Sequence, residues 1–299
     1  MHKYVSDFLK MHDVKYKENL KLKEISPIRI GAEADFVAYP DSEHKLALLL
    51  AFLMDSKIKH KISGRMSNIL PPDKKYEGVI VRTDLIRSVE IRGRILDLAC
   101  GVSLPFASRI AFESGLVGLE CLSGIPGSIA GAAVGNAGAF GAEIADRILS
   151  VRLFQPSTGD VYSISAAEAD FGYRASRFKG TDLVILSVCL QLCLGDPALI
   201  KGEMDKFRER RIMTQPNEPS LGSCFKRPDE NIYAARLIDE CGLKGYSVGD
   251  AEISRKHAGF IINKGHATAD DYIRLSDHAA RAVYEKFGIT LEREIEIMN

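Results

Sequence analysis

The stretch GLECLSGIPGSIAGAAVGNAGAFGAE, residues 118–143, carries a glycine every three to six residues. Glycine weakens helices and strands, and it is favoured where the backbone takes a positive φ or passes close to another group. A run of this length therefore predicts a ligand that the main chain contacts or, as the alternative, tight internal packing.

The glycine spacing does not fit the common nucleotide motifs. No G-x-x-x-x-G-K-[ST] occurs, and Gly135, Gly138 and Gly141 do not form the G-x-G-x-x-G of a dinucleotide-binding β-α-β unit. Two other sites combine turn amides with small or polar side chains, which suits an anion: ISGRMSNIL at 62–70 and GIPGSIAG at 124–131. Together they predict a large phosphate-bearing ligand or, equally, two structural turns.

The composition excludes several classes of protein. Lys plus Arg and Asp plus Glu both number 40, so no overall charge favours nucleic acid. The six cysteines form no Cys-x-x-Cys and lie mostly in apolar runs, which predicts reduced core residues. The histidines show no metal-ligand spacing, no apolar run has membrane-spanning length, and the N-terminus has no signal core. We expect a cytoplasmic protein without a metal, a nucleic-acid partner or a membrane partner.

The order of the predicted elements favours an α+β fold in about two domains, because strands cluster first and helices mixed with short strands follow. Residues 1–25 are expected to form one short helix. A hairpin is expected to turn at Arg92-Gly93, and the alternation in 289–298 predicts a regular strand. Further helices are expected at 43–58, 104–115, 200–213, 231–242 and 268–288, and further strands within 29–40, 60–63, 77–83, 148–164, 182–195 and 257–263.

Several polar residues are candidates for chemistry, and each also has a purely structural interpretation. Arg174 in FGYRASRFKG is either a solvated arginine on a surface strand or a bidentate ligand for a carboxylate or phosphate. Ser223 in LGSCFKRP is a turn residue or a proton donor, and no Gly-x-Ser-x-Gly elbow indicates a hydrolase. In LEREIEI, one of the three glutamates could face a cleft. Lys244 and His257 are solvated or satisfied polar residues, or they line a site.

Seven stretches, taken together, resemble the UDP-N-acetylenolpyruvoylglucosamine reductases over nearly the whole chain from about residue 26. They are GLECLSGIPGSIAGAAVGNAGAFG, FGYRASRF, GSCFKRP, ARLIDECGLKG, KHAGFIIN, ATADD and LEREIEI, in the family's order and spacing. The short distance from SCFK to LIDE resembles the more compact, type II form.

The resemblance implies a two-lobed FAD-binding domain of the PCMH type, followed by a smaller α+β substrate-binding domain. The expected boundaries are a lead-in at 1–25, lobes at 26–96 and 97–198, and the substrate-binding domain at 199–299. It also implies non-covalent FAD, NADPH as the reductant, a monomer, and reduction of UDP-N-acetylglucosamine enolpyruvate to UDP-N-acetylmuramate in peptidoglycan precursor synthesis.

The resemblance assigns roles to particular residues. Ser223 resembles the family's proton donor, and Arg174 and Glu294 resemble the pair that polarises the substrate. The substrate-binding positions would be Tyr173, Lys226, Lys244 and His257. The cofactor-binding positions would be Ser63, Gly64, Arg65, Met66, Ser67, Asn68, Gly124, Ile125, Pro126, Gly127, Ser128, Gly131, Asn136 and Ala137.

The chain departs from the family pattern mainly in residues expected near FAD. Met66 stands where the family has the second glycine of its phosphate turn, and Ala32 and Ser26-Pro27 change another motif. A positive φ at Met66 would cost about 1 kcal/mol. Phe140 replaces a common tyrosine, and Arg227 a common asparagine. Two alternatives follow: a flavin-deficient relative that only binds a nucleotide-sugar, and a different flavin oxidase on the same fold.

Overall fold

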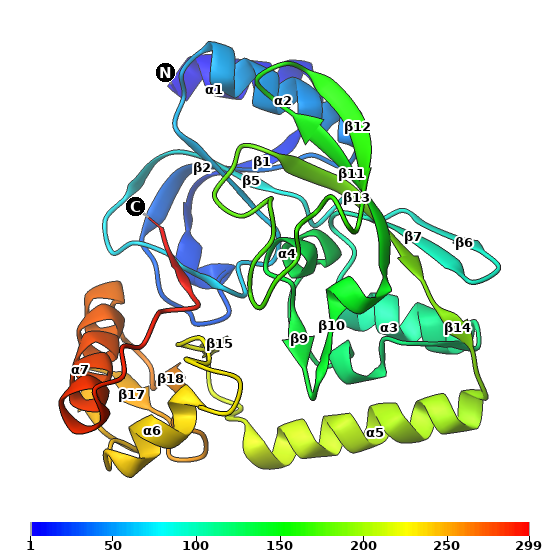
Figure 1. Cartoon of the computed structure of the whole chain (residues 1–299). Helices are drawn as coiled ribbons and strands as arrows, with labels where there is room; N and C mark the ends of the chain where they lie inside the picture. The colour runs from blue at the N-terminus through cyan, green and yellow to red at the C-terminus, as the bar shows by residue number, and fades with distance from the viewer. Residues whose placement is uncertain (1, 299) are drawn as a thin grey trace. The chain divides into compact units, whose positions relative to one another are not determined.

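The structure, a computed structural model, describes residues 2–298, and the chain is divided into two compact units (Figure 1). The first unit comprises the residues up to Glu18, Phe36–Arg65 and Gly78–Arg210. The second comprises Asn19–Asp35, Met66–Glu77 and the chain from Arg211 onward. Both contain helices and strands, so the fold is α+β as predicted. The boundaries expected at residues 26, 97 and 199 stay predictions.

Two sheets and a large apolar core build the first unit, with three strands of the first sheet contributing residues to both units. The first sheet has the order β1-β2-β5-β3, and the antiparallel second sheet has the order β12-β11-β13-β7-β6. Their strands are β1 Lys15–Lys21, β2 Glu33–Tyr39, β3 His60–Ser63, β5 Tyr76–Arg82, β6 Val89–Arg92, β7 Ile95–Ala99, β11 Ile148–Gln155, β12 Asp160–Ser165 and β13 Val184–Gln191. The predicted hairpin is confirmed, although its turn residues are Gly93 and Arg94 and not Arg92 and Gly93; Gly93 has a φ of +61°.

The helices of this unit are fixed by their apolar faces and caps. In α2, Leu46, Leu49, Leu50 and Leu53 are buried at helical spacing, and the Ser42 hydroxyl accepts a hydrogen bond from the Lys45 amide at 3.2 Å. The helices and 3₁₀ turns are α1 His2–Met11, α2 Glu43–Asp55, α3 Leu104–Glu113, η2 Glu120–Leu122, α4 Ile129–Val134, η3 Ile144–Arg147 and α5 Pro197–Thr214, the last of which continues into the second unit. Two short pairs complete the unit, β8 Leu116–Val117 with β14 Cys193–Leu194 and β9 Gly138–Ala139 with β10 Ala142–Glu143.

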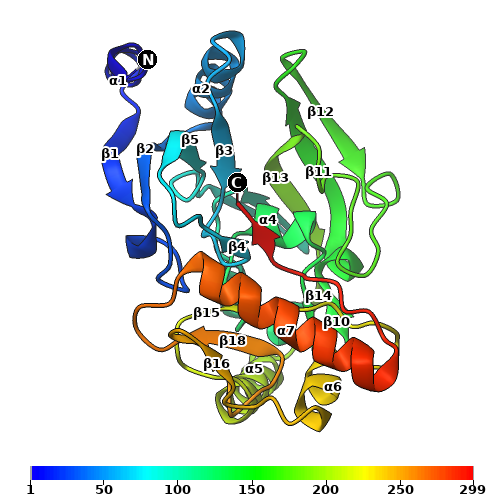
Figure 2. The same cartoon turned by 90° about the vertical axis from the view of Figure 1, so that its left-hand side faces the viewer.

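The second unit is a four-stranded sheet against helices α6 and α7. Helix α7 packs against β16 and β17 of this sheet, and Figure 2 shows it above β16 and β18. The sheet has the order β15-β18-β17-β16, and β4 and β19 form a separate parallel two-stranded sheet. The bounds are η1 Leu22–Glu24, β4 Ile69–Leu70, β15 Ser220–Ser223, α6 Ala234–Glu240, β16 Ser247–Val248, β17 Ala251–Ile253, β18 Phe260–Asn263, α7 Ala269–Phe287 and β19 Glu296–Ile297.

Helix α7 begins and ends where the sequence predicts. The Thr268 hydroxyl accepts from the Asp271 amide at 3.0 Å, and the Asp271 carboxylate accepts from the Thr268 amide at 3.0 Å, which is a capping box. Gly288 ends the helix in the left-handed conformation at φ +69°. Tyr272, Leu275, Ala279 and Val283 form the buried face of the helix.

Two expectations about elements are wrong, and one element had no prediction. The lead-in contains strand β1 as well as a helix, because charged residues are common on an edge strand such as this one. The C-terminal strand is confined to Glu296–Ile297, although Leu291 and Ile295 are buried and Glu292 and Glu296 exposed as the alternation predicts. The glycine-rich stretch contains an unpredicted helix, α4.

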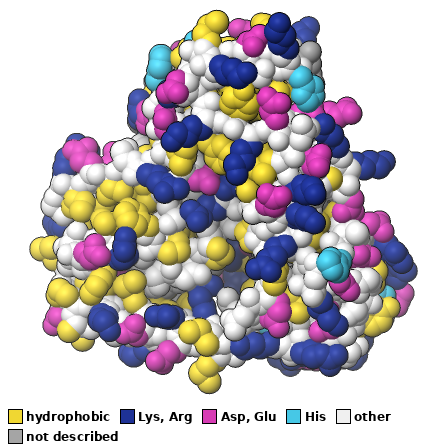
Figure 3. All heavy atoms as spheres, turned by 180° about the vertical axis from the view of Figure 1, so that it is seen from behind, with side chains coloured by type: hydrophobic (Ala, Val, Ile, Leu, Met, Phe, Trp, Pro, Cys, Tyr) yellow, Lys and Arg dark blue, Asp and Glu magenta, His cyan; other side chains and the backbone are white. Residues whose placement is uncertain are grey.

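The distribution of surface charge agrees with the composition, whereas the positions of the cysteines agree with the predicted core only in part. Basic and acidic side chains are interspersed on the face drawn in Figure 3. Cys100, Cys121 and Cys224 are buried free thiols, whereas Cys193 is exposed, contrary to a core position. Among residues 2–298, no helix has both the length and the apolar character needed to cross a membrane.

Candidate active site

Arg174 lies at the tip of a tight turn in the first unit, not on a surface strand. The amides of Gly172 and Ala175 each donate to the other residue's carbonyl at 3.1 Å, which closes the turn around Tyr173 and Arg174. Arg174 has a φ of +54°, a conformation that is uncommon for a side chain of this size. The Ser176 hydroxyl donates to the Val134 carbonyl of α4 at 2.7 Å and so fixes the turn to the glycine-rich stretch.

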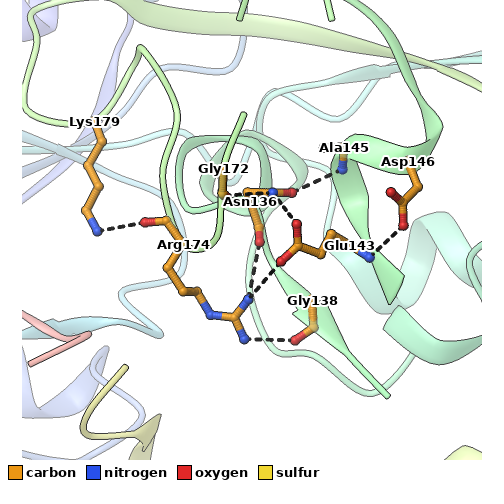
Figure 4. A network of polar contacts seen from close by, with 8 residues as sticks. All are labelled: Asn136, Gly138, Glu143, Ala145, Asp146, Gly172, Arg174 and Lys179. Carbon is orange, nitrogen blue, oxygen red and sulfur yellow. Dashed lines mark hydrogen bonds and ion pairs between the residues drawn. The ribbon is translucent and has the colours of Figure 1, made fainter. Parts of the chain in front are cut away.

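The Arg174 guanidinium is held by main-chain carbonyls of that stretch (Figure 4). It donates to the Asn136 carbonyl at 3.4 Å and to the Gly138 carbonyl at 3.0 Å. One Glu143 carboxylate oxygen lies 4.0 Å away, and the Tyr173 ring lies 5.1 Å from the guanidinium carbon. These contacts orient a partly buried, permanently charged group, which is the arrangement that recognises an anion.

A buried amide connects the two strands of the hairpin that supplies these carbonyls. Asn136 Nδ2 donates to Glu143 Oε2 at 2.6 Å and to the Gly172 carbonyl at 2.9 Å, and its Oδ1 accepts from the Ala145 amide at 3.2 Å. The Glu143 amide donates to Asp146 in a capping box at η3. Sequence reasoning missed Glu143, although the spacing of Glu143 and Asp146 was a visible signal for a cap.

The two glycine sites predicted to bind phosphate approach each other at Gly64 and Ser128, both in the first unit. A Cβ added to Gly64 would stand 2.3 Å from the Ser128 hydroxyl oxygen, so only glycine permits this approach. Ser128 is buried and accepts from the Gly131 amide at 3.2 Å. Gly124 and Gly131 are exposed, and Gly127 has a φ of +147°. A close pair of turns with accessible main chain fits the diphosphate of a dinucleotide.

Met66 takes the left-handed conformation that was expected to be costly. Its φ is +56°, so the position needs a positive φ, and its side chain is buried at 2% exposure. Ala32 is not among the described non-glycine residues with positive φ. Phe140 stacks on Phe207 of α5, with ring centroids 5.0 Å apart. Phe140 also has a positive φ, +55°, so two of these three departures lie on left-handed backbone and Ala32 does not.

Ser223 and Glu294 lie on adjacent segments of the second unit. Ser223 ends strand β15, is exposed, and follows Gly222, which has a φ of +81°. The Glu294 amide donates to the carbonyl of Cys224, which follows Ser223 in the chain, at 2.8 Å. Burial raises the pKa of the Cys224 thiol to about 12, so this neighbour stays protonated.

The other residues expected to bind substrate are also in defined contacts. Lys226 forms an ion pair with Glu292, and the Lys244 ammonium lies 2.5 Å from an Asp239 carboxylate oxygen. Burial lowers the pKa of His257, and the nearby Lys244 charge acts in the same direction. His257 Nδ1 accepts from the Gly259 amide at 3.1 Å, so the neutral ring carries its proton on Nε2.

The residues expected to be catalytic are therefore divided between the two units. Arg174 lies beside Asn136 in the first unit. Ser223 and Glu294 lie in the second unit, where the Glu294 amide donates to the carbonyl of Cys224, the residue after Ser223. Convergence of all three on one substrate stays a prediction. Within residues 2–298, no cluster of three or more His, Cys, Asp or Glu side chains is placed to hold a metal ion.

Residues 34–165 match the family described as FAD binding domain. This match covers both glycine sites and the hairpin that contacts Arg174. The fold and these turns together define a protein of the FAD-binding class, and FAD is its cofactor. The flavin-deficient alternative is not retained.

The remaining comparisons identify the family. Residues 215–298 match the family described as UDP-N-acetylenolpyruvoylglucosamine reductase, C-terminal domain. The chain is 39% identical to the reductase of that name from Caldicellulosiruptor bescii, over 97% of this chain and 93% of the relative, and 39% identical to one from Streptococcus pneumoniae, over 96% and 94%. It resembles the crystal structure of the reductase from Thermus caldophilus with a TM-score of 0.81 and 30% identity, over 96% of this chain and 99% of the other. The chain belongs to the UDP-N-acetylenolpyruvoylglucosamine reductase family and is an oxidoreductase.

Proposed function

We propose that this protein reduces the enolpyruvyl group of UDP-N-acetylglucosamine enolpyruvate to give UDP-N-acetylmuramate for peptidoglycan synthesis, with NADPH as the reductant. The observation that carries the proposal is the fixed Arg174 guanidinium beside the glycine-rich stretch, because the substrate presents a carboxylate conjugated to the reacting double bond. A monomeric state and a cytoplasmic location stay predictions.

The cofactor would be held by the two glycine turns, with Ser63–Asn68 and 124–131 as the binding segments and Asn136 and Ala137 beside them. The positive φ of Met66 supports this proposal, because the turn keeps the backbone conformation that glycine would give. When bound, FAD supplies the hydride that adds to the methylene carbon of the enolpyruvyl ether.

The side chains of this chain deal with the charge and the proton that the reduction requires. Negative charge develops on the carbon next to the carboxylate, and a guanidinium oriented in advance, that of Arg174, stabilises it where it forms. The exposed Ser223 hydroxyl donates a proton to that carbon, which is a strong base at this stage. Glu294 hydrogen-bonds near the substrate carboxylate. Tyr173, Lys226, Lys244 and His257 are proposed to bind the rest of the nucleotide-sugar.

Replacement of Ser223 by alanine tests the proposal. Reduction of the flavin by NADPH should stay within about two-fold of the normal rate, because the serine takes no part in it. Reoxidation of the reduced enzyme by UDP-N-acetylglucosamine enolpyruvate should fall by a factor of about 10² or more, the size typical of a lost general acid. Both rates are measured by stopped-flow absorbance of the flavin.

A matched control is Ser220→Ala, which changes a serine on the same strand. It should leave both rates near normal. If the Ser223→Ala enzyme turns over within a few-fold of the unchanged enzyme, Ser223 is not the proton donor.

A further inference from the structure

We propose that Asn68 and Arg293 are positioning residues that hold Glu294 in place from two sides. The inference rests on the proposed function, in which Glu294 interacts with the substrate. Asn68 was expected to bind the cofactor, and Arg293 has no role in the proposal so far. All the contacts that support the inference lie within the second unit.

The Glu294 main chain is fixed through both of its polar groups. Its amide donates to the Cys224 carbonyl at 2.8 Å, and its carbonyl accepts from Asn68 Nδ2 at 3.0 Å. The first contact connects Glu294 to the segment that follows Ser223. The second connects it to the turn that follows Met66.

Asn68 also begins the pairing that sets the register of the C-terminal segment. The Glu296 amide donates to the Asn68 carbonyl at 2.9 Å, and the Met298 amide donates to the Leu70 carbonyl at 3.0 Å. Because β19 covers only Glu296–Ile297, regular strand pairing begins after residue 294 and does not include it. The Asn68 side chain therefore extends the attachment to Glu294 where the strand does not.

Arg293 attaches the same segment to α7. Its Nε donates to the Ser276 hydroxyl at 2.8 Å, one terminal nitrogen donates to the Ile273 carbonyl at 3.3 Å, and the same nitrogen pairs with Asp277. Residue 293 forms a bridge with Phe225, so the chain is extended there. Successive side chains of an extended chain point to opposite sides, so Arg293 on the helix side directs Glu294 away from α7.

Displacing a carboxyl group that acts on the substrate by about 1 Å lowers the reaction rate roughly ten- to a hundred-fold. Asn68→Ala and Arg293→Met should therefore slow reoxidation of the reduced enzyme by the enolpyruvyl substrate by this factor, mainly through kcat. In the Arg293→Met variant, the FAD affinity, measured by flavin fluorescence, and the rate of flavin reduction by NADPH should both stay within about two-fold of the normal values. Arg293→Lys, which keeps one donor, should recover part of the loss.

A purely structural role would give a different pattern, because a loosened unit would lower FAD affinity and slow both half-reactions. Arg274→Met is the matched control, since Arg274 is an exposed arginine on α7, the helix that Arg293 contacts, and lies 3.7 Å from an Asp270 carboxylate oxygen. If Arg293→Met does not fold, Asp277→Asn removes the same ion pair more gently and should slow reoxidation alone.

Glu294→Gln separates failure of this inference from failure of the proposed function. If Glu294→Gln reoxidises at the normal rate, the proposed role of Glu294 is wrong and the inference falls with it. If Glu294→Gln is slow but Asn68→Ala and Arg293→Met are normal, only the inference is overturned. A further outcome also overturns it. If the Asn68→Ala variant loses FAD, but the fraction of it that retains FAD is reoxidised at the normal rate, Asn68 is a cofactor ligand.

Discussion

Arg174 and Glu294, the two residues proposed to polarise the substrate, are held by different kinds of contact. Arg174 is oriented by main-chain carbonyls of a glycine-rich hairpin, within a turn where it has a left-handed backbone itself. Glu294 is held by a main-chain hydrogen bond to Cys224, by the Asn68 side chain and by the contacts of its neighbour Arg293 with α7. The first arrangement depends on backbone shape and the second on two side chains, so different substitutions should break them.

The largest expected effect comes from replacing Arg174 by lysine. A single ammonium cannot donate to the carbonyls of both Asn136 and Gly138 and still present a planar donor pair. Reoxidation by the enolpyruvyl substrate should fall about 10²–10³-fold, the cost of losing one charge-stabilising donor. Stopped-flow absorbance measures the rate.

Arg177→Lys is the control for that substitution, because Arg177 is an exposed arginine of the same loop that donates to the Glu168 carbonyl. Similar losses in the two variants would show that the loop responds to any change of arginine. The special role of the Arg174 orientation would then be wrong.

The next largest effect should come from Gly138→Ala, which tests the backbone side of the comparison. The new Cβ would lie 2.8 Å from the Ala142 carbonyl oxygen and 2.9 Å from Glu143 Cγ. Overpacking of this kind costs about 1–3 kcal/mol of unfolding free energy. Urea unfolding should show the loss of stability. Reoxidation by the enolpyruvyl substrate should also slow, because the Gly138 carbonyl that accepts from Arg174 moves.

Gly172→Ala provides the matched control, since its Cβ would meet no atom closer than the Ala175 Cβ at 3.8 Å. It should be close to normal in stability. Equal destabilisation by both alanines would mean that loss of glycine flexibility, and not the close approach at Gly138, sets the cost.

Met66→Gly should have a smaller effect, and its sign is informative. Removing the left-handed strain should raise the free energy of unfolding by about 1–2 kcal/mol, whereas losing a buried methionine side chain should lower it by about 1.5–3 kcal/mol. Glycine also costs about 0.5–1 kcal/mol in chain entropy. The free energy of unfolding should therefore fall by roughly 1–2 kcal/mol, as measured in urea.

Met66→Leu keeps both the burial and the strain and should lie near the unchanged protein in the same measurement. An increase in stability for Met66→Gly would show that strain outweighs burial at this turn. The turn that carries Asn68 would then resemble the Arg174 region in depending on glycine.

The smallest effect concerns His257 and acid. Its pKa is lower in the folded protein than the ordinary value of 6.5, so the folded state binds fewer protons than the unfolded chain below about pH 6.5. Stability should therefore fall as the pH is lowered through this range towards the folded pKa. Urea unfolding at pH 7.5 and pH 5.5 should show a smaller decrease for His257→Gln; equal decreases would contradict the prediction.

Much of the fold could be predicted because strong local signals coincide with tertiary structure. The buried leucines of α2, the capping box of α7 and the hairpin of β6 and β7 agree with the sequence pattern. Helix α4 was not predicted, because it has only six residues and contains Gly131, although its alanines and the Ser128 cap favour a helix. The C-terminal alternation predicted burial correctly but not the length of the strand, since β19 pairs with β4 only over Glu296–Ile297 and residue 293 forms a bridge with a different partner, Phe225.

The candidate site was predictable in part for the same reason. The family motifs indicated Arg174, Ser223 and Glu294, but not the contacts that orient them. The carbonyls that hold Arg174 have no side-chain signature. Asn68 and Glu294 are 226 positions apart, so no local pattern connects them.

The second unit is discontinuous in the sequence, and this has a consequence for biosynthesis. Ile28, Ile30 and Leu70 belong to the same apolar core as α6 and α7, yet they leave the ribosome long before Arg211. These early segments must wait for their partners while the first unit has all of its residues, so it is free to fold first. A nascent chain stopped before residue 211 would leave those three apolar side chains without their core, which makes them natural contacts for a chaperone.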